Sequence, residues 1–176
     1  MIVMKFGGTS VEDAADIERA AAIVRDRVLQ APVVVVSAMA RVTDHLLAMG
    51  RAAGLGDRDK ALELSRSIRE RHFATASDLL GAGTFTKLHS ELEADFDALD
   101  ELLRGIVAVG EITPRTYDNI ASFGERLSSR LVTEAFSARG LNATHVDSRE
   151  CIVTDATHTK AVPDFDVTNE RLAARL

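Results

Sequence analysis

A lysine and two glycines near the start of the chain could hold a phosphate group. Residues 4–10 read Met-Lys-Phe-Gly-Gly-Thr-Ser, directly after a short apolar run. Gly7 and Gly8 lack a Cβ atom, so their backbone N–H groups can approach an anion closely, and Lys5 would add a mobile positive charge. The alternative is an ordinary turn between a strand and a helix, because short glycine patterns are weak signals. The spacing matches neither Gly-x-Gly-x-x-Gly nor Gly-x-x-x-x-Gly-Lys-Ser/Thr, which disfavours a classical dinucleotide fold and a P-loop enzyme.

Two hydroxyl residues follow the next apolar run. Ser37 comes directly after Val33–Val36, and Thr43 lies six residues later, where a helix is expected to begin. Ligands of open α/β sheets bind at the carboxyl ends of strands, so both hydroxyl groups could contact a ligand there. In the structural alternative, the side chain of Thr43 only caps the N-terminus of the helix.

A third polar cluster, residues 122–129, lies inside a predicted helix and reads Ser-Phe-Gly-Glu-Arg-Leu-Ser-Ser. Gly124 would cost this helix about 1 kcal/mol relative to alanine. A close approach by a ligand or by another backbone would explain why glycine is present. In the structural alternative, Glu125 and Arg126 form a solvated face and Gly124 packs against the sheet.

These clusters need a scaffold of alternating strands and helices. Ile2–Phe6 is a predicted buried strand. Ser10 and Asp13 resemble a capping box, which predicts a helix from there to about Leu29. The β-branched run Val33–Val36 is typical of a strand buried on both faces. Strand, helix and strand in this order form a βαβ unit, which predicts a parallel sheet.

Helical periodicity dominates the middle of the chain. The predicted helices cover residues 42–54, 57–80, 86–107 and 113–137. The third has nearly heptad leucine spacing, which we interpret as core packing rather than a partner-binding coiled coil. The last part is predicted as a strand over residues 142–146, a polar loop over 155–166, and a helix that begins near Thr168. The predicted architecture is therefore α/β, with a helical insertion between the second and third strands of a parallel sheet.

The composition is ordinary for a globular domain of 176 residues, with 46% hydrophobic and 27% charged residues. A formal net charge of −6 without a basic stripe argues against a nucleic-acid partner. The longest apolar run is too short to span a membrane, and no signal sequence opens the chain. The single cysteine, Cys151, allows no internal disulfide and predicts a reducing, cytoplasmic location. The five histidines show no metal-ligand spacing, so no metal site is predicted from the protein's own side chains.

In this order, the three clusters resemble the N-terminal catalytic lobe of the aspartate kinases, which belong to the amino acid kinase superfamily. The similar stretches are Lys5–Ser10, Ser37-Ala38 with Thr43, Gly124–Ser129, Val146–Arg149 and Thr154-Asp155. They span essentially the whole chain. The Lys-Phe-Gly-Gly-Thr-Ser variant is more typical of aspartate kinases than of glutamate, acetylglutamate, uridylate or carbamate kinases. The resemblance implies the parallel-sheet sandwich of the amino acid kinase type, with residues 1–176 as one N-terminal lobe.

The resemblance also implies a reaction, in which ATP phosphorylates the side-chain carboxylate of L-aspartate to 4-phospho-L-aspartate. The implied ATP- and phosphate-binding residues are Lys5, Phe6, Gly7 and Gly8, with Lys5 as the catalytic residue. The implied substrate-binding residues are Thr9, Ser37, Thr43 and Glu125, with Glu125 pairing with the ammonium group. A carboxylate acceptor with a pKa of about 3.9 is already ionised at neutral pH, so no general base is required. Mg²⁺ would arrive with ATP and be held largely by phosphate oxygens.

The family pattern continues beyond residue 176, with a Gly-Arg-Gly-Gly-Ser-Asp segment, a nucleotide-base pocket and regulatory ACT domains. We therefore expect a truncated lobe with little or no kinase activity by itself, and an exposed sheet edge. Aspartate kinases usually dimerise, which allows a homodimer here. Two alternatives stay open. One is a non-catalytic amino-acid-binding or interaction module, and the other is an amino acid kinase with a different acceptor, such as glutamate or acetylglutamate.

Overall fold

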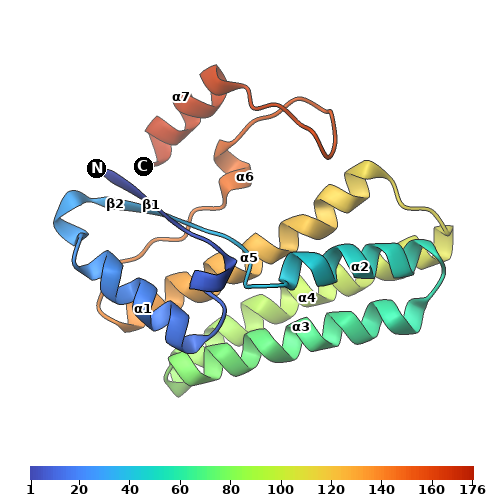
Figure 1. Cartoon of the computed structure of the whole chain (residues 1–176), viewed down its shortest axis with the longest axis horizontal. Coiled ribbons are helices and arrows are strands. Elements are labelled where there is room, and N and C mark those ends of the chain that lie inside the picture. The colour runs from blue at the N-terminus through green and yellow to red at the C-terminus, as the bar shows by residue number, and fades with distance from the viewer.

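The computed structural model describes all 176 residues and is mostly helical. Figure 1 shows a two-stranded sheet and α1 (Ala14–Arg25) at one end of a group of four long helices, α2 to α5. Two further helices, α6 and α7, follow at the end of the chain and lie apart from α3. Met1 and Leu176 border the same cavity, so the two termini lie near each other.

The sheet consists of β1 (Ile2–Phe6) and β2 (Pro32–Val36), which run parallel. Phe6 lies opposite Val36, so both strands end at the same edge. The helix between them is α1, and the predicted βαβ unit is confirmed. The two loops that follow the strands are thereby placed next to each other.

Only one face of this sheet is covered. Alternate side chains point to opposite faces, and Met4, Val34 and Val36 pack against the core. Val3 is 65% exposed and Val35 is 45% exposed on the other face. The prediction that residues 33–36 are buried on both faces is therefore wrong, because no other element of the chain covers the outer face.

The start of α1 differs from the prediction. Residues Gly8–Ser10 form a short 3-10 turn, η1, and the helix begins only at Ala14. Asp13 is the N-cap, and its carboxylate accepts a hydrogen bond of 2.9 Å from the backbone N–H of Asp16. Ser10 therefore forms no capping box, because the aspartate three residues later caps the helix instead. The helix ends at Arg25, and a second 3-10 turn, η2 (Val28–Gln30), leads into β2.

The four predicted helices of the insertion after β2 are confirmed, but the third strand that was predicted to follow the insertion does not form. The helices of the insertion are α2 (Val42–Gly54), α3 (Arg58–Leu79), α4 (Ala82–Val109) and α5 (Pro114–Ala138). Local chemistry explains two of their ends. Gly110 adopts a positive φ of 72° where α4 stops, and Thr113 caps α5 with proline in its first turn.

The leucine spacing of α4 serves the core of this chain. Leu88, Leu92, Phe96, Leu99 and Leu103 are each no more than 1% exposed. They belong to one continuous cluster of 31 buried hydrophobic residues that joins the helices to the inner face of the sheet. The interpretation as core packing is therefore confirmed. Burial of this kind supplies about 1.5–3 kcal/mol for each large apolar side chain.

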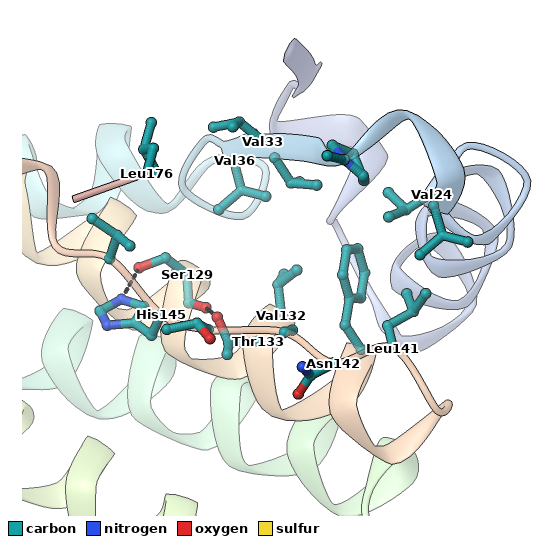
Figure 2. Close-up of a pocket in the computed structure, with 18 of the residues that line it drawn as sticks. Val24, Val33, Val36, Ser129, Val132, Thr133, Leu141, Asn142, His145 and Leu176 are labelled. Carbon is teal, nitrogen blue, oxygen red and sulfur yellow. Dashed lines mark hydrogen bonds between the residues drawn. The ribbon is translucent and has the colours of Figure 1, made fainter. Parts of the chain in front are cut away.

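The predicted third strand, residues 142–146, does not form. The segment has no partner strand, and the only sheet of the chain is the β1–β2 pair. A cavity of about 610 Å³ separates it from β2, with His145 on one side and Val33 and Val36 on the other (Figure 2). An extended segment becomes a strand only when a neighbour pairs with its backbone groups, and none lies within reach here.

The last part of the chain holds two helices. The short α6 (Ser148–Cys151) was not predicted, and α7 (Phe165–Arg175) begins three residues before the predicted start. The segment between them is loop-like, as predicted, apart from one isolated bridge between Thr154 and Pro163. Asp164 caps α7 through the backbone N–H of Val167. No helix of this structure is long and apolar enough to cross a membrane.

Candidate active site

The loops that follow β1 and β2 contact each other through their backbones. Ser37 donates its N–H to the carbonyl of Phe6 at 3.0 Å, and Ala40 donates to the carbonyl of Gly8 at 3.1 Å. These bonds continue the strand pairing into the loops. The structure therefore brings together the first two of the clusters that the sequence predicted as a site.

Gly8 is required by this close approach. A Cβ atom at position 8 would lie 2.9 Å from the carbonyl oxygen of Ala38, and 3.4 Å from the Cα of Ala40. At Gly7, by contrast, a Cβ atom would meet nothing within 4 Å. The first glycine faces open space and the second permits contact between the loops, so the two glycines have different roles.

Several backbone N–H groups of the turn after β1 have no hydrogen-bond acceptor. The N–H groups of Gly7, Gly8 and Thr9 donate to no carbonyl or side chain of the chain. Lys5 is exposed at the end of β1, and no carboxylate of the chain pairs with its ammonium group. Successive free amides beside a free ammonium group suit an anion such as the phosphates of ATP. The donor set therefore fits the nucleotide phosphates that the sequence implies.

Thr43 lies in the first turn of α2 but does not cap it. The N-cap is Arg41, which has a φ of +67° and forms no side-chain capping bond. The backbone N–H groups of Thr43 and Asp44 also have no acceptor within the chain, as expected for the first turn of a helix. The hydroxyl group of Thr43 is exposed and makes no hydrogen bond in the chain. The alternative in which Thr43 only caps the N-terminus of the helix is therefore wrong.

The third cluster reaches the second through Gly124 on α5. A Cβ atom at Gly124 would lie 2.8 Å from the Cβ of Ala38 and 3.2 Å from a methyl group of Leu46. Glycine at this position lets α5 pack directly on the β2–α2 loop. Gly124 therefore packs against this loop, and not against the sheet as the structural alternative proposed.

Glu125 extends from the same helix to the end of β2. Its Oε1 accepts a hydrogen bond of 3.4 Å from the backbone N–H of Ala38, next to Ser37. The side chain is otherwise exposed, and no cation of the chain pairs with it. A free carboxylate beside a serine hydroxyl could bind an ammonium group of a substrate.

Arg126, the next residue, is held inside the helix group rather than in solvent. Its guanidinium lies over the ring of Phe123, 4.3 Å from the ring centre, and forms an ion pair with Asp95 of α4. Arg130 adds a contact of 3.1 Å to the other oxygen of Asp95. Burial lowers the pKa of Arg126 against the opposing effect of Asp95. This network holds α5 against α4 and thereby supports the helix that carries Glu125.

Arg71, which belongs to α3, is a residue of the site that was not predicted from the sequence. Its guanidinium donates to the carbonyl oxygens of Ala40, at 2.6 Å, and Glu12, at 2.8 Å. The two loops of the site are thus joined from a third element. No pattern in the sequence could have indicated this, because an arginine on an amphipathic helix is ordinary.

The cavity between β2 and residues 142–146 does not coincide with this site. It is lined mainly by apolar side chains and includes none of the predicted site residues. One of the polar contacts in its lining is a hydrogen bond of 3.0 Å between Ser129 and His145 (Figure 2). Burial and the neighbouring Arg130 lower the pKa of His145. The chain also contains no cluster of three or more side chains that could hold a metal ion.

The sequence and the fold of this chain are similar to those of known proteins. The sequence model of the amino acid kinase family matches residues 1–173. The chain belongs to the amino acid kinase family. The predicted resemblance and the predicted fold class are both confirmed by this match and by the solved structures of aspartokinases.

Several aspartokinases are similar to this member of the family. Aspartokinase 2, chloroplastic, of Arabidopsis thaliana is 37% identical over 158 residues, which cover 87% of this chain and 28% of the relative. A bifunctional aspartokinase/homoserine dehydrogenase 1, chloroplastic, of the same plant is 33% identical over 171 residues, or 97% of this chain and 19% of the relative. The chain thus spans 19% and 28% of the lengths of these two relatives.

Solved structures of aspartokinases have the same fold. E. coli aspartokinase III in complex with aspartate and ADP superposes with a TM-score of 0.86 and 27% identity, covering 99% of this chain and 37% of that one. Clostridium acetobutylicum aspartate kinase gives a TM-score of 0.69 at 17% identity, over 100% of this chain and 36% of that one. The second match concerns the fold alone.

Proposed function

We propose that this chain provides the acceptor-binding and part of the phosphate-binding machinery of an aspartate kinase. The reaction transfers the γ-phosphoryl group of ATP to the side-chain carboxylate of L-aspartate and gives 4-phospho-L-aspartate and ADP. The observation that carries the proposal is the convergence on Ala38. Gly8 approaches its carbonyl, Gly124 approaches its side chain, and Glu125 accepts its N–H. The aspartate and ADP bound to the similar E. coli aspartokinase III support this assignment of substrates.

The chemistry needs positioning and charge neutralisation rather than a base. The acceptor carboxylate has an ordinary pKa of about 3.9 and is ionised at neutral pH. One of its oxygens forms a bond to the γ-phosphorus while the bond to the β,γ-bridging oxygen breaks, and ADP leaves with the electron pair. Lys5 and the free amides of Gly7 and Gly8 would neutralise negative charge on the phosphates. Mg²⁺, bound mainly to the phosphates, would supply further positive charge at the transferred group.

The residues at the carboxyl end of β2 would hold the acceptor. Ser37 and Thr43 would offer hydroxyl donors to acceptor or phosphate oxygens, and Thr9 would lie across from them on the first loop. Glu125 would bind the ammonium group of aspartate, because its carboxylate is exposed and unpaired apart from Ala38. An acceptor without an ammonium group in this position would leave Glu125 uncompensated and would bind less well.

The test is an acceptor panel on the longest natural polypeptide that contains this sequence. Acyl phosphates formed from aspartate, glutamate and N-acetylglutamate are trapped as hydroxamates. The proposal predicts product with aspartate and much less with the other two. Preferential phosphorylation of glutamate or N-acetylglutamate would assign the chain to another kinase of the family.

The second candidate is a non-catalytic module that binds an amino acid. Calorimetry of the 176-residue chain with aspartate and with ATP, each alone, separates the cases. Aspartate binding without nucleotide binding, together with no turnover in the longer polypeptide, would favour the module.

We also propose the cytoplasmic location that the single cysteine predicted, and the homodimer that the resemblance to aspartate kinases allowed. The single cysteine, Cys151, is free and buried and therefore forms no disulfide. The similar plant proteins are chloroplastic by name, so cell fractionation with an antibody against this chain is the appropriate test of location. Sedimentation of the longest polypeptide tests the dimer.

A further inference from the structure

Arg71 joins three segments that are far apart in the sequence. It extends from the middle of α3, in the helical insertion, to the loops that follow β1 and β2. One guanidinium nitrogen donates to the carbonyl of Ala40 at 2.6 Å and the other donates to the carbonyl of Glu12 at 2.8 Å. Its side chain is 31% exposed, and the carboxylate of Glu12 lies 3.9 Å away.

Arg71 is the only donor within the chain for both carbonyl groups. Neither Ala40 nor Glu12 accepts a backbone hydrogen bond through its carbonyl oxygen. The planar guanidinium has donors in a fixed arrangement, so binding both oxygens sets the distance between them. Charge-assisted hydrogen bonds of this kind are roughly twice as strong as neutral ones.

A backbone hydrogen bond on the opposite side of residue 40 also links these loops. The backbone N–H of Ala40 donates to the carbonyl of Gly8 at 3.1 Å, where the absent side chain of Gly8 allows contact. Arg71 binds the carbonyl of the same residue, Ala40. The peptide units on both sides of Ala40 are thereby fixed, one to the glycine turn and one to α3.

We propose that Arg71 is a positioning residue that fixes the glycine turn relative to the β2–α2 loop. This inference rests on the proposed function, in which the first loop holds phosphate and the second holds the acceptor. Loosening the two loops would change the separation between phosphorus and carboxylate oxygen. A misplacement of about 1 Å can reduce turnover on the order of 100-fold.

Hydrogen exchange on the 176-residue chain tests the positioning directly. Arg71→Met removes the guanidinium and keeps an unbranched apolar side chain. We expect amide exchange at least about tenfold faster at Ala40 and Val11, which donate to Gly8, and unchanged exchange within α4. Arg66→Met is the matched control, since Arg66 is exposed on the same helix and contacts only the carbonyl of Leu62, at 3.4 Å. Unchanged exchange at Ala40 and Val11 in Arg71→Met would overturn the proposal.

Kinetics on the longest polypeptide test the consequence for the reaction. We expect Arg71→Met to lower kcat about 10- to 100-fold at a temperature where the variant stays folded, and Arg66→Met to leave it unchanged. Arg71→Lys should be intermediate, because one ammonium group cannot bind both carbonyls with the same geometry. An unaltered kcat in Arg71→Met, with only the melting temperature lowered, would reduce Arg71 to a purely stabilising residue and overturn the proposal.

The exchange experiment and the kinetic experiment distinguish a failure of the proposed function from a failure of the positioning role of Arg71. If the unmodified polypeptide does not phosphorylate aspartate, the proposed function falls. The exchange rates of Ala40 and Val11 then still decide whether Arg71 holds the two loops together.

Discussion

At Lys5 the chain has an ammonium group that nothing inside the molecule neutralises. The residue precedes Phe6, the last residue of β1, and lies beside the turn in which Gly7, Gly8 and Thr9 keep free N–H groups. A cationic side chain that pairs with a carboxylate of the same chain stabilises the fold. An unpaired cation beside free backbone N–H groups is instead available to an anionic ligand. The lysine is therefore the residue whose removal most directly tests the phosphate role.

We predict that Lys5→Ala lowers kcat/KM for ATP-dependent aspartyl phosphate formation about 10²–10³-fold, the usual cost of losing one group that stabilises a transition state. The measurement is hydroxamate-coupled kinetics on the longest polypeptide. Lys60→Ala is the control, because Lys60 is exposed and pairs only with Glu63, at 3.0 Å. Turnover of the Lys5 variant equal to that of the control would rule out the phosphate role.

His72 controls stability rather than chemistry. It is fully buried, its Nδ1 donates to the carbonyl of Ile68 at 2.8 Å, and its Nε2 has no partner. Burial lowers the pKa of His72 from 6.5 to about 4. The unfolded chain therefore binds a proton that the folded chain does not, and stability falls as the pH falls from about 6.5 to about 4.

We predict that this histidine costs the protein about 3 kcal/mol of unfolding free energy between those pH values, from a pKa difference of about 2.5. Chemical denaturation at several pH values measures the loss. His72→Leu should remove most of it, whereas His158→Gln, at an exposed residue, should retain it. An equally steep pH dependence in His72→Leu would show that other groups cause the acid sensitivity.

At the scale of elements, the contact between α5 and the β2–α2 loop determines the site. Gly124→Ala would place a methyl group 2.8 Å from the Cβ of Ala38. We predict a loss of about 1–3 kcal/mol, since overpacking outweighs the gain in helix propensity. The variant should also weaken aspartate binding, because Glu125 moves with the helix.

The control for this prediction is Gly105→Ala on α4. A Cβ atom at position 105 meets nothing within 4 Å, so this variant should gain about 0.5–1 kcal/mol. Thermal and chemical denaturation of both variants give the comparison. Stabilisation by both substitutions would mean that α5 does not pack as closely on the loop as described.

Most elements that depend on local sequence patterns were predicted correctly. The period of the apolar residues located α2 to α5, and the β-branched runs located β1 and β2. Features that depend on contacts between distant segments were not predicted. Residues 142–146 have strand-like composition but no partner, whereas the error at the start of α1, where Asp13 rather than Ser10 is the N-cap, was local. The contacts of Arg71 with two loop carbonyls also depend on the tertiary fold alone.

The candidate site was predicted to a similar extent. The sequence put Lys5 at the end of the first strand, Ser37 after the second strand and Glu125 on a helix, and the structure brings these segments together around Ala38. What the sequence could not supply is how they are held. The contact at Gly124 and the ion pair between Arg126 and Asp95 join residues that are more than 30 positions apart, so they follow only from the packing of the helices.

For the whole molecule, the uncovered face of the sheet is the main departure from a closed globule. Val3 and Val35 lie on it, 65% and 45% exposed, and β1 and β2 have no further strand beside them. An exposed apolar strand pair with unpaired backbone groups is a template for association with another chain. The 176-residue chain should therefore self-associate as its concentration rises.

We predict that Val3→Glu reduces this association, because a carboxylate on the open face opposes sheet-to-sheet contact. Sedimentation velocity over a range of concentrations should show a smaller mean mass for the variant than for the unmodified chain. Leu55→Glu is the control, since Leu55 is 86% exposed at the end of α2, away from the sheet. Equal association of all three proteins would mean that another surface is responsible. A reduction in Leu55→Glu as large as in Val3→Glu would attribute the effect to net charge rather than to the open face.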